Sequence, residues 1–163
     1  GEETSIFLKM NSLTDRQLID ALKEASQAGV KIKMIIRGIC CILPGIEGKT
    51  DNIEVISVVG RFLEHSRIFC FGTGENMKMY IASADWMTRN TENRVEIAAP
   101  IYDQKIKNSI YDTLRIMWKD NLKARILCSD GTYKKPEIKE GDELIDCQNY
   151  LRHEYKVGRK IKL

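Results

Sequence analysis

The sequence predicts an α/β domain in which helices flank a mixed β-sheet. A helical pattern that ends at Gly29 is followed almost at once by an apolar strand over Lys31–Ile36, an order typical of α/β proteins. Further short apolar runs, rich in β-branched residues, lead to a second amphipathic helix at 103–118. At 163 residues and 18.7 kDa the chain can bury a core without disulfides or metals. We therefore expect residues 1–163 to form a single domain.

The first predicted helix begins at Thr14. Thr14 and Gln17 have the spacing of a capping box, in which each side chain hydrogen-bonds to a backbone amide at the start of the helix. The apolar residues behind them have helical spacing, namely Leu18, Ile19, Leu22 and Ala25. Gly29 predicts the end of the helix, because glycine adopts the left-handed conformation that closes a helix.

The strands are predicted from short apolar segments bounded by turn residues. Lys31–Ile36 first alternates and then becomes fully apolar, as a strand does when it enters the interior of a sheet. Segment 72–76 predicts a hairpin loop, Pro100 the end of a strand, and Asp130 with Gly131 a turn. Five further strands are predicted at 52–59, 67–71, 77–82, 94–99 and 123–128.

Two more helices are predicted in the second half of the chain. The helix at 103–118 carries apolar residues at positions 106, 110, 114 and 117, a spacing that gives it one buried face. A terminal helix is predicted at 142–156. We expect Trp118, on the inner face of the first of these helices, and Trp86 to be largely buried.

The composition excludes several classes of protein. With 26 basic and 23 acidic residues, the net charge of +3 is too small to favour nucleic acid as a partner, yet it is compatible with a local cationic pocket. The longest stretch without a charged residue is nine positions, 38–46, which excludes a transmembrane segment. The first five residues lack the basic and apolar regions of a signal peptide.

The cysteines predict neither a disulfide framework nor a zinc site. Their number is odd and no pair has the C-x-x-C spacing; they are Cys40, Cys41, Cys70, Cys128 and Cys147. Free thiols are typical of a reducing compartment, so we expect a cytoplasmic protein.

His65 is the first candidate for chemistry. Arg61 and Arg67 lie within four residues of it, at the entrance to an apolar strand, and such a cluster suits a site that holds phosphate oxygens. The alternative is a strand-edge histidine that hydrogen-bonds to a neighbour. The other histidine, His153, lies among charged residues of the terminal helix and is expected on a solvated face.

More arginines follow the predicted strands. Arg37 comes directly after the apolar strand and before glycine, where α/β sheets place ligand contacts, although a surface arginine would fit the same position. Segment 83–90, SADWMTRN, contains Arg89 and follows another strand, and its alternative interpretation is a helix cap at Ser83 or Asp85. Arg94 opens the next predicted strand. If three or more of the five arginines converge, they form a pocket for a polyanion.

Several motifs in order resemble one family. Segments 7–13 (FLKMNSL), 36–41 (IRGICC), 60–67 (GRFLEHSR) and 83–90 resemble the C-terminal catalytic part of bacterial polyphosphate kinase of the histidine-phosphorylating type. Segments 121–125 and 130–131 are also similar, so the resemblance covers nearly the whole chain. It implies the second of two phospholipase D-like domains, with Arg67 in the place of the lysine of that superfamily's His-x-Lys motif.

The resemblance also implies an activity and its residues. The family transfers the γ-phosphate of ATP reversibly to inorganic polyphosphate through a phosphohistidine, with Mg²⁺. His65 is then the catalytic candidate here, and Arg37, His65 and Arg94 are expected to contact phosphates. Arg61, Arg67 and Arg89 lie in the same motifs with less defined roles.

The implied phosphohistidine and most Mg²⁺ contacts belong to a preceding domain of the family, so no metal site is expected in this chain, and the chain by itself is expected to be inactive. The implied partners are ATP or ADP, polyphosphate, the preceding domains and further copies of the full-length chain.

Two alternatives remain at this point. A phospholipase D-like phosphodiesterase or nuclease half-domain would normally carry a His-x-Lys with an acid several residues on, whereas the sixth residue after Arg67 is Thr73. A non-catalytic phosphate-binding module would need only the arginines.

Overall fold

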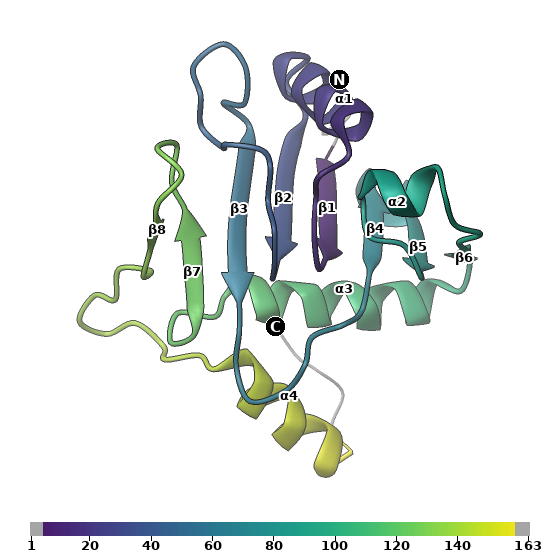
Figure 1. Cartoon of the computed structure of the whole chain (residues 1–163). Coiled ribbons are helices and arrows are strands. Elements are labelled where there is room, and N and C mark those ends of the chain that lie inside the picture. Colours follow the sequence, from purple (N-terminus) through teal and green to yellow (C-terminus); the bar gives the residue numbers. More distant parts are fainter. Residues whose placement is uncertain (1–4, 159–163) are drawn as a thin grey trace.

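One mixed sheet of eight strands forms the centre of the molecule (Figure 1). The computed structural model describes residues 5–158. The strands lie in the order β6-β5-β4-β1-β2-β3-β7-β8. Their bounds are β1 (Ser5–Met10), β2 (Lys31–Ile36), β3 (Ile53–Val58), β4 (Ile68–Phe71), β5 (Lys78–Ala82), β6 (Ala98–Ile101), β7 (Ala124–Leu127) and β8 (Tyr133–Lys134).

The three central strands β1, β2 and β3 are parallel, and the strands on both sides are antiparallel to their neighbours. The mixed sheet with flanking helices is therefore confirmed. Strand β1 was not among the predicted strands, although it pairs with both β2 and β4. Its sequence is mostly apolar but is interrupted by a lysine, Lys9, which is buried.

Helices cover both faces of the sheet (Figure 1). On one face, α1 (Arg16–Gln27) packs over a core that includes Leu8, Met34 and Val55, and the short α2 (Thr88–Thr91) lies beside it. On the other face, α3 (Gln104–Trp118) and α4 (Cys147–Lys156) cover a second core. The alternation of side chains along each strand divides the apolar residues between these two cores.

The ends of two helices are set by aspartates. Asp15, rather than Thr14, is the N-cap of α1, and its carboxylate accepts from the amide of Leu18 at 3.1 Å. The predicted capping box at Thr14 is wrong, because the Thr14 amide instead donates to the carbonyl of Trp86 at 2.8 Å. Gly29, with φ +89°, closes the helix as predicted.

The C-terminal half shows more differences from the prediction. Strand β6 begins at Ala98 rather than at 94 and contains Pro100, which is tolerated because β6 is an edge strand and the missing N–H leaves the sheet intact. Helix α4 begins at Cys147, five residues later than predicted, with Asp146 as its N-cap. The two-residue strand β8 was not predicted, since it is too short to leave a pattern.

Trp86 and Trp118 are only partly buried, not largely buried as predicted, although Trp118 packs on the core as expected. All five cysteines are free thiols. Within residues 5–158, no helix has the length and apolar character needed to cross a bilayer. The signal-peptide prediction rests chiefly on residues 1–4, which lie outside the described residues.

Candidate active site

The candidate site lies where the carboxyl ends of β1 and β2 meet the start of β4. Strands β1 and β2 are parallel, so Met10 and Ile36 pair and both strands end at the same edge. Strand β4 runs in the opposite direction, and its first residue, Ile68, pairs with Lys9. The topology thus brings together Asn11, Arg37 and the segment 64–67, which are far apart in sequence.

Asp85 is the centre of a hydrogen-bond network at this edge. Its buried carboxylate accepts from Nε and Nη2 of Arg67, both at 3.1 Å. It also accepts from the backbone amide of Asn11 at 2.7 Å and from the Asn11 side chain at 3.1 Å. Burial by itself would raise the pKa of Asp85, but the bonds from Arg67 and Asn11 hold it below its ordinary value of 3.8. Asp85 is therefore ionised and paired.

Asn11 connects this pair to Arg37. The side-chain oxygen of Asn11 accepts from Nε of Arg37 at 3.3 Å and from Nη2 at 2.9 Å. Asn11 is buried, with an exposed fraction of 6%. Its amide thus fixes the guanidinium of Arg37 to the end of the neighbouring strand.

Arg67 holds His65 at the other end of the network. Nη1 and Nη2 of Arg67 lie 3.4 and 3.3 Å from Nδ1 and Nε2 of the His65 ring, so that the two planar groups face each other. Nη1 also donates to the backbone carbonyl of His65 at 3.2 Å. The His65 side chain is exposed and accessible to a ligand. A continuous series of contacts thus joins His65 to Arg37 through Arg67, Asp85 and Asn11.

The two central arginines differ in their charge balance. Arg67 forms a two-bond ion pair with Asp85, which compensates its charge. Arg37 bonds to a neutral amide, and no acid among the described residues forms an ion pair with it. A guanidinium that is held in place without a carboxylate can bind a phosphate group through two parallel hydrogen bonds.

Glu96 lies at the same edge of the sheet. Its carboxylate accepts from the hydroxyl of Ser83 and, at 2.5 Å, from Asn90. These bonds, with smaller contributions from Arg94 and Arg67, lower the pKa of Glu96 below its ordinary value. Neither Ser83 nor Asp85 caps a helix, as the alternative interpretation required, because the N-cap of α2 is Met87.

Two predicted site residues remain apart. Arg61 lies over the ring of Phe62, 5.4 Å from its centroid, and Arg89 is exposed on α2. Within residues 5–158, no hydrogen bond joins either of them to the network around Asp85. The structure therefore brings together Arg37, His65 and Arg67 and leaves Arg61 and Arg89 outside. Arg94 is exposed and, among the described residues, forms no ion pair with Glu96.

Asn11 and Asp85, which organise the site, are not among the site residues that the sequence predicts. Asn11 lies within a family motif, and Asp85 also fits a helix cap. One local feature points to this part of the chain: Lys9 lies between two apolar residues in the segment that forms β1. No group of three His, Cys, Asp or Glu side chains in the part of the chain that the structure describes could hold a metal ion.

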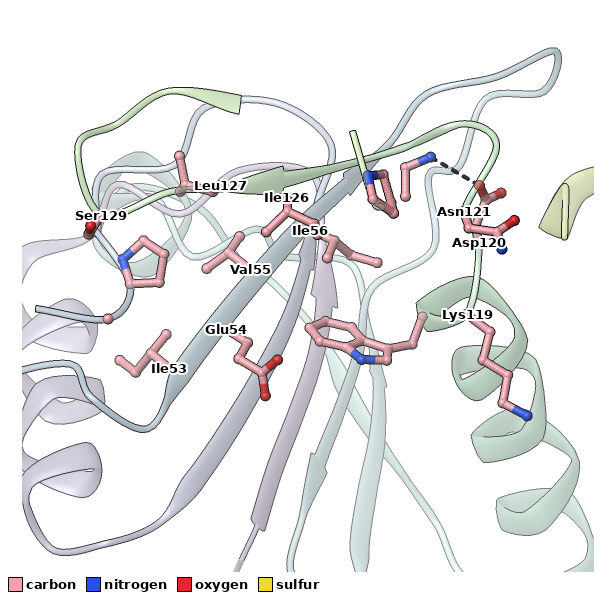
Figure 2. A pocket seen from close by; sticks show the side chains of 15 residues that line it. Ile53, Glu54, Val55, Ile56, Lys119, Asp120, Asn121, Ile126, Leu127 and Ser129 are labelled. Carbon is pink, nitrogen blue, oxygen red and sulfur yellow. Dashed lines mark hydrogen bonds between the residues drawn. The ribbon is translucent and has the colours of Figure 1, made fainter. Parts of the chain in front are cut away.

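A separate pocket of about 380 Å³ lies beside β3, β7 and the end of α3 (Figure 2). Ile53, Val55, Ile56 and Trp118 form much of its apolar lining, with Glu54 and Asp120 at its border. Neither arginine nor histidine lines this pocket. Lys119 is the one basic residue among the described residues that line it, and most of the lining is apolar.

Comparisons with known proteins identify the family of this chain. Residues 1–148 match the family described as polyphosphate kinase C-terminal domain 2. This chain belongs to the polyphosphate kinase family. It is 52% identical over 143 residues to the polyphosphate kinase of Bacillus anthracis and 51% identical over 142 residues to that of Thermosynechococcus vestitus. These matches cover 88% and 87% of the chain but only 20% and 19% of the relatives, so the chain spans about a fifth of a polyphosphate kinase.

Solved structures support the same family and fold. The polyphosphate kinase of Porphyromonas gingivalis matches with a TM-score of 0.91 at 38% identity, over 97% of this chain and 24% of that one. Nuc from Salmonella typhimurium, a phospholipase D family member, matches with a TM-score of 0.56 at 16% identity, over 83% and 85% of the two chains. The second likeness shows the fold alone, and with it the predicted phospholipase D-like fold is confirmed.

Proposed function

We propose that this chain forms one half of the active site of a polyphosphate kinase, which transfers the γ-phosphate of ATP reversibly to inorganic polyphosphate. The observation that carries the proposal is the uncompensated guanidinium of Arg37, held by Asn11 at the same edge as the exposed His65. Such a pair can bind a phosphate group and act on it.

His65 is the proposed catalytic residue. In phosphoryl transfer the protein acts mainly through positioning and charge stabilisation, since the covalent chemistry is small. Arg67 fixes the His65 ring, which can then donate or accept a proton, or stabilise charge, as the phosphoryl group passes. Arg37 and Arg94 are the proposed phosphate contacts. We propose that Arg61, Arg67 and Arg89 belong to the wider phosphate-binding surface.

The nucleophile and the metal belong to other parts of the proposed enzyme. From the resemblance to the family, we assign Mg²⁺ and the phosphohistidine to preceding domains, and no step here depends on the ion. We also propose that residues 1–163 are one domain and that the full-length enzyme is cytoplasmic and assembles from several copies.

A chimera tests this function. In the polyphosphate kinase of Bacillus anthracis, this chain replaces the segment that it matches. We expect ATP-dependent polyphosphate synthesis, and a loss of turnover of about 10²–10⁴-fold in the His65→Ala variant. Arg37→Ala should raise the KM for ATP. The control is His153→Ala, on an exposed part of α4, which should leave turnover unchanged.

Two outcomes would contradict the proposal. One is a folded chimera that makes no polyphosphate or that cleaves a phosphodiester instead. The other is the 163-residue chain by itself becoming labelled on His65 by γ-labelled ATP and Mg²⁺, because we expect that chain to bind polyphosphate weakly and to transfer nothing.

A further inference from the structure

The segment between β3 and β4, residues 59–67, carries His65 and passes over α4 (Figure 1). It has no regular secondary structure, so other contacts must hold its backbone. Two buried polar side chains from distant parts of the chain supply them: Lys9 of β1 and Gln148 of α4, with exposed fractions of 2% and 5%.

Lys9 binds the backbone on both sides of His65. Its Nζ donates to the carbonyl of Glu64 at 3.3 Å and to that of Ser66 at 3.0 Å. The carboxylate of Glu64 lies 3.9 Å from the same nitrogen. A lysine is rarely buried so completely, because removing its charge from water is unfavourable unless partners compensate. Here the partners are the two residues that flank His65.

Gln148 binds the same segment from the opposite side. Its side-chain nitrogen donates to the carbonyl of Phe62 at 2.8 Å and to the carboxylate of Glu64 at 3.0 Å. Its oxygen accepts from the amide of Phe62 at 2.9 Å. Glu64 thus lies between Lys9 and Gln148. Gly60 leaves the space that Gln148 needs, since a Cβ there would lie 2.5 Å from its oxygen.

We propose that Lys9 and Gln148 are positioning residues for His65, so that strand β1 and helix α4 together set where the catalytic histidine lies. The effect on catalysis rests on the proposed function. The positioning of His65 by Lys9 and Gln148 does not depend on it. With the carbonyls of residues 62, 64 and 66 held from within, the His65 ring is left outside, against Arg67. A shift of about 1 Å in such a group can reduce turnover by about 10²-fold.

The first test measures amide hydrogen exchange in the 163-residue chain. In Gln148→Leu, and in Gly60→Ala, which displaces Gln148 without changing it, the amides of Phe62 and His65 should exchange about tenfold faster. Amides of β2 should not change. Unchanged exchange at residues 62–66 in both variants would overturn the proposal, whatever the enzyme does.

The second test measures turnover in the chimera. Lys9→Met keeps about the volume of the side chain but removes its donors, and Glu64, which is 22% exposed, keeps Gln148 as a partner. Because the carbonyls of Glu64 and Ser66 lose a donor, urea unfolding first verifies that the variant is folded. We expect kcat to fall about 10–10²-fold in Lys9→Met and in Gln148→Leu, with the KM for ATP changed less than about twofold. Because both act through one segment, the double variant should lose little more than either single variant.

The matched control is Lys33→Met. Lys33 lies on β2, half-buried above the ring of Trp118, and does not touch residues 59–67 in the described contacts. It should keep the kcat of the unmodified chimera. If the chimera is active and depends on His65, yet Lys9→Met and Gln148→Leu keep full kcat, the positioning role fails while the proposed function stands. If Lys33→Met loses as much kcat as Lys9→Met, the effect is one of general stability and the inference is also wrong.

Discussion

The network around Asp85 and the apolar pocket beside β3 and β7 are built on the same sheet, and both contain buried acids. In the pocket, Asp120 accepts from the backbone amides of Lys123 and Ala124 at 2.6 and 3.0 Å and from that of Cys147 at 2.8 Å. Its charge stabilises a turn and the start of α4. In the network, Asp85 instead compensates Arg67 and orients Asn11, which holds Arg37.

The two regions differ in whether a positive charge without an acidic partner is available to bind a ligand. Backbone amides satisfy Asp120 within the fold, so the pocket presents mostly apolar surface (Figure 2). The network has two arginines for one central acid. Asp85 pairs with Arg67, so the guanidinium of Arg37 has no carboxylate partner among the described residues. Our proposal therefore places the phosphate site at the network and not at the pocket, because a fixed guanidinium without a carboxylate partner suits an anionic ligand and an apolar cavity does not.

Of the substitutions that test this difference, Asp85→Ala is expected to reduce the free energy of unfolding most. Removing one partner of a buried ion pair leaves the other unpaired, and we expect about 3–5 kcal/mol of stability to be lost. Glu54→Ala, at the exposed border of the pocket, should change stability by less than about 0.5 kcal/mol. Urea unfolding at pH 7 measures both.

The Asp85 effect also depends on pH. Because the folded pKa of Asp85 lies below 3.8, its contribution is present above that pH and is lost as the pH falls through the folded pKa. Equal losses in the Asp85→Ala and Glu54→Ala variants would show that the two regions do not differ in this way.

A smaller effect is expected from Trp118→Ala in the wall of the pocket. Trp118 packs edge to face on Phe7, with ring centroids 5.6 Å apart, but it is only partly buried. A buried tryptophan contributes about 3–5 kcal/mol, so we expect about 2 kcal/mol here and no change in polyphosphate binding by calorimetry. Trp86→Ala, next to Asp85, should reduce stability and also weaken polyphosphate binding. Equal effects of the two substitutions on binding would contradict the difference between the two regions.

The smallest expected effect, about 1 kcal/mol for each pH unit, tests the burial of the Lys9 charge. Burial, opposed in part by Glu64, lowers the pKa of Lys9 from 10.5 to about 8. Between these two pH values the unfolded chain binds more protons, so the contribution of Lys9 to stability rises with pH. Relative to Lys9→Met, the wild type should gain about 1 kcal/mol per pH unit from pH 8 to pH 10, measured by urea unfolding. A constant difference would show that Lys9 titrates normally.

The sequence by itself determined the elements with strong local patterns. Strands β2, β3, β4 and β7 and helix α3 were predicted within one or two residues, because apolar periodicity records burial directly. The order of arginine and histidine motifs also identified the family, which the comparisons confirm. The capping-box spacing to Gln17 predicts Thr14 as the cap of α1, whereas the structure has Asp15, whose carboxylate accepts from the amide of Leu18. The backbone amides of both residues donate to the carbonyl of Trp86, a distant contact that the local pattern does not record.

The tertiary structure decided which charged residues belong together. Local patterns do not show which of the five arginines have an acidic partner. In the structure Arg67 is paired with Asp85, Arg37 has no carboxylate partner among the described residues, and Arg89 lies apart on α2. That outcome depends on strand order and direction, since parallel β1 and β2 and antiparallel β4 bring residues 11, 37 and 67 to one edge. Pairing between strands is a long-range property, and local sequence patterns do not record which partner lies opposite.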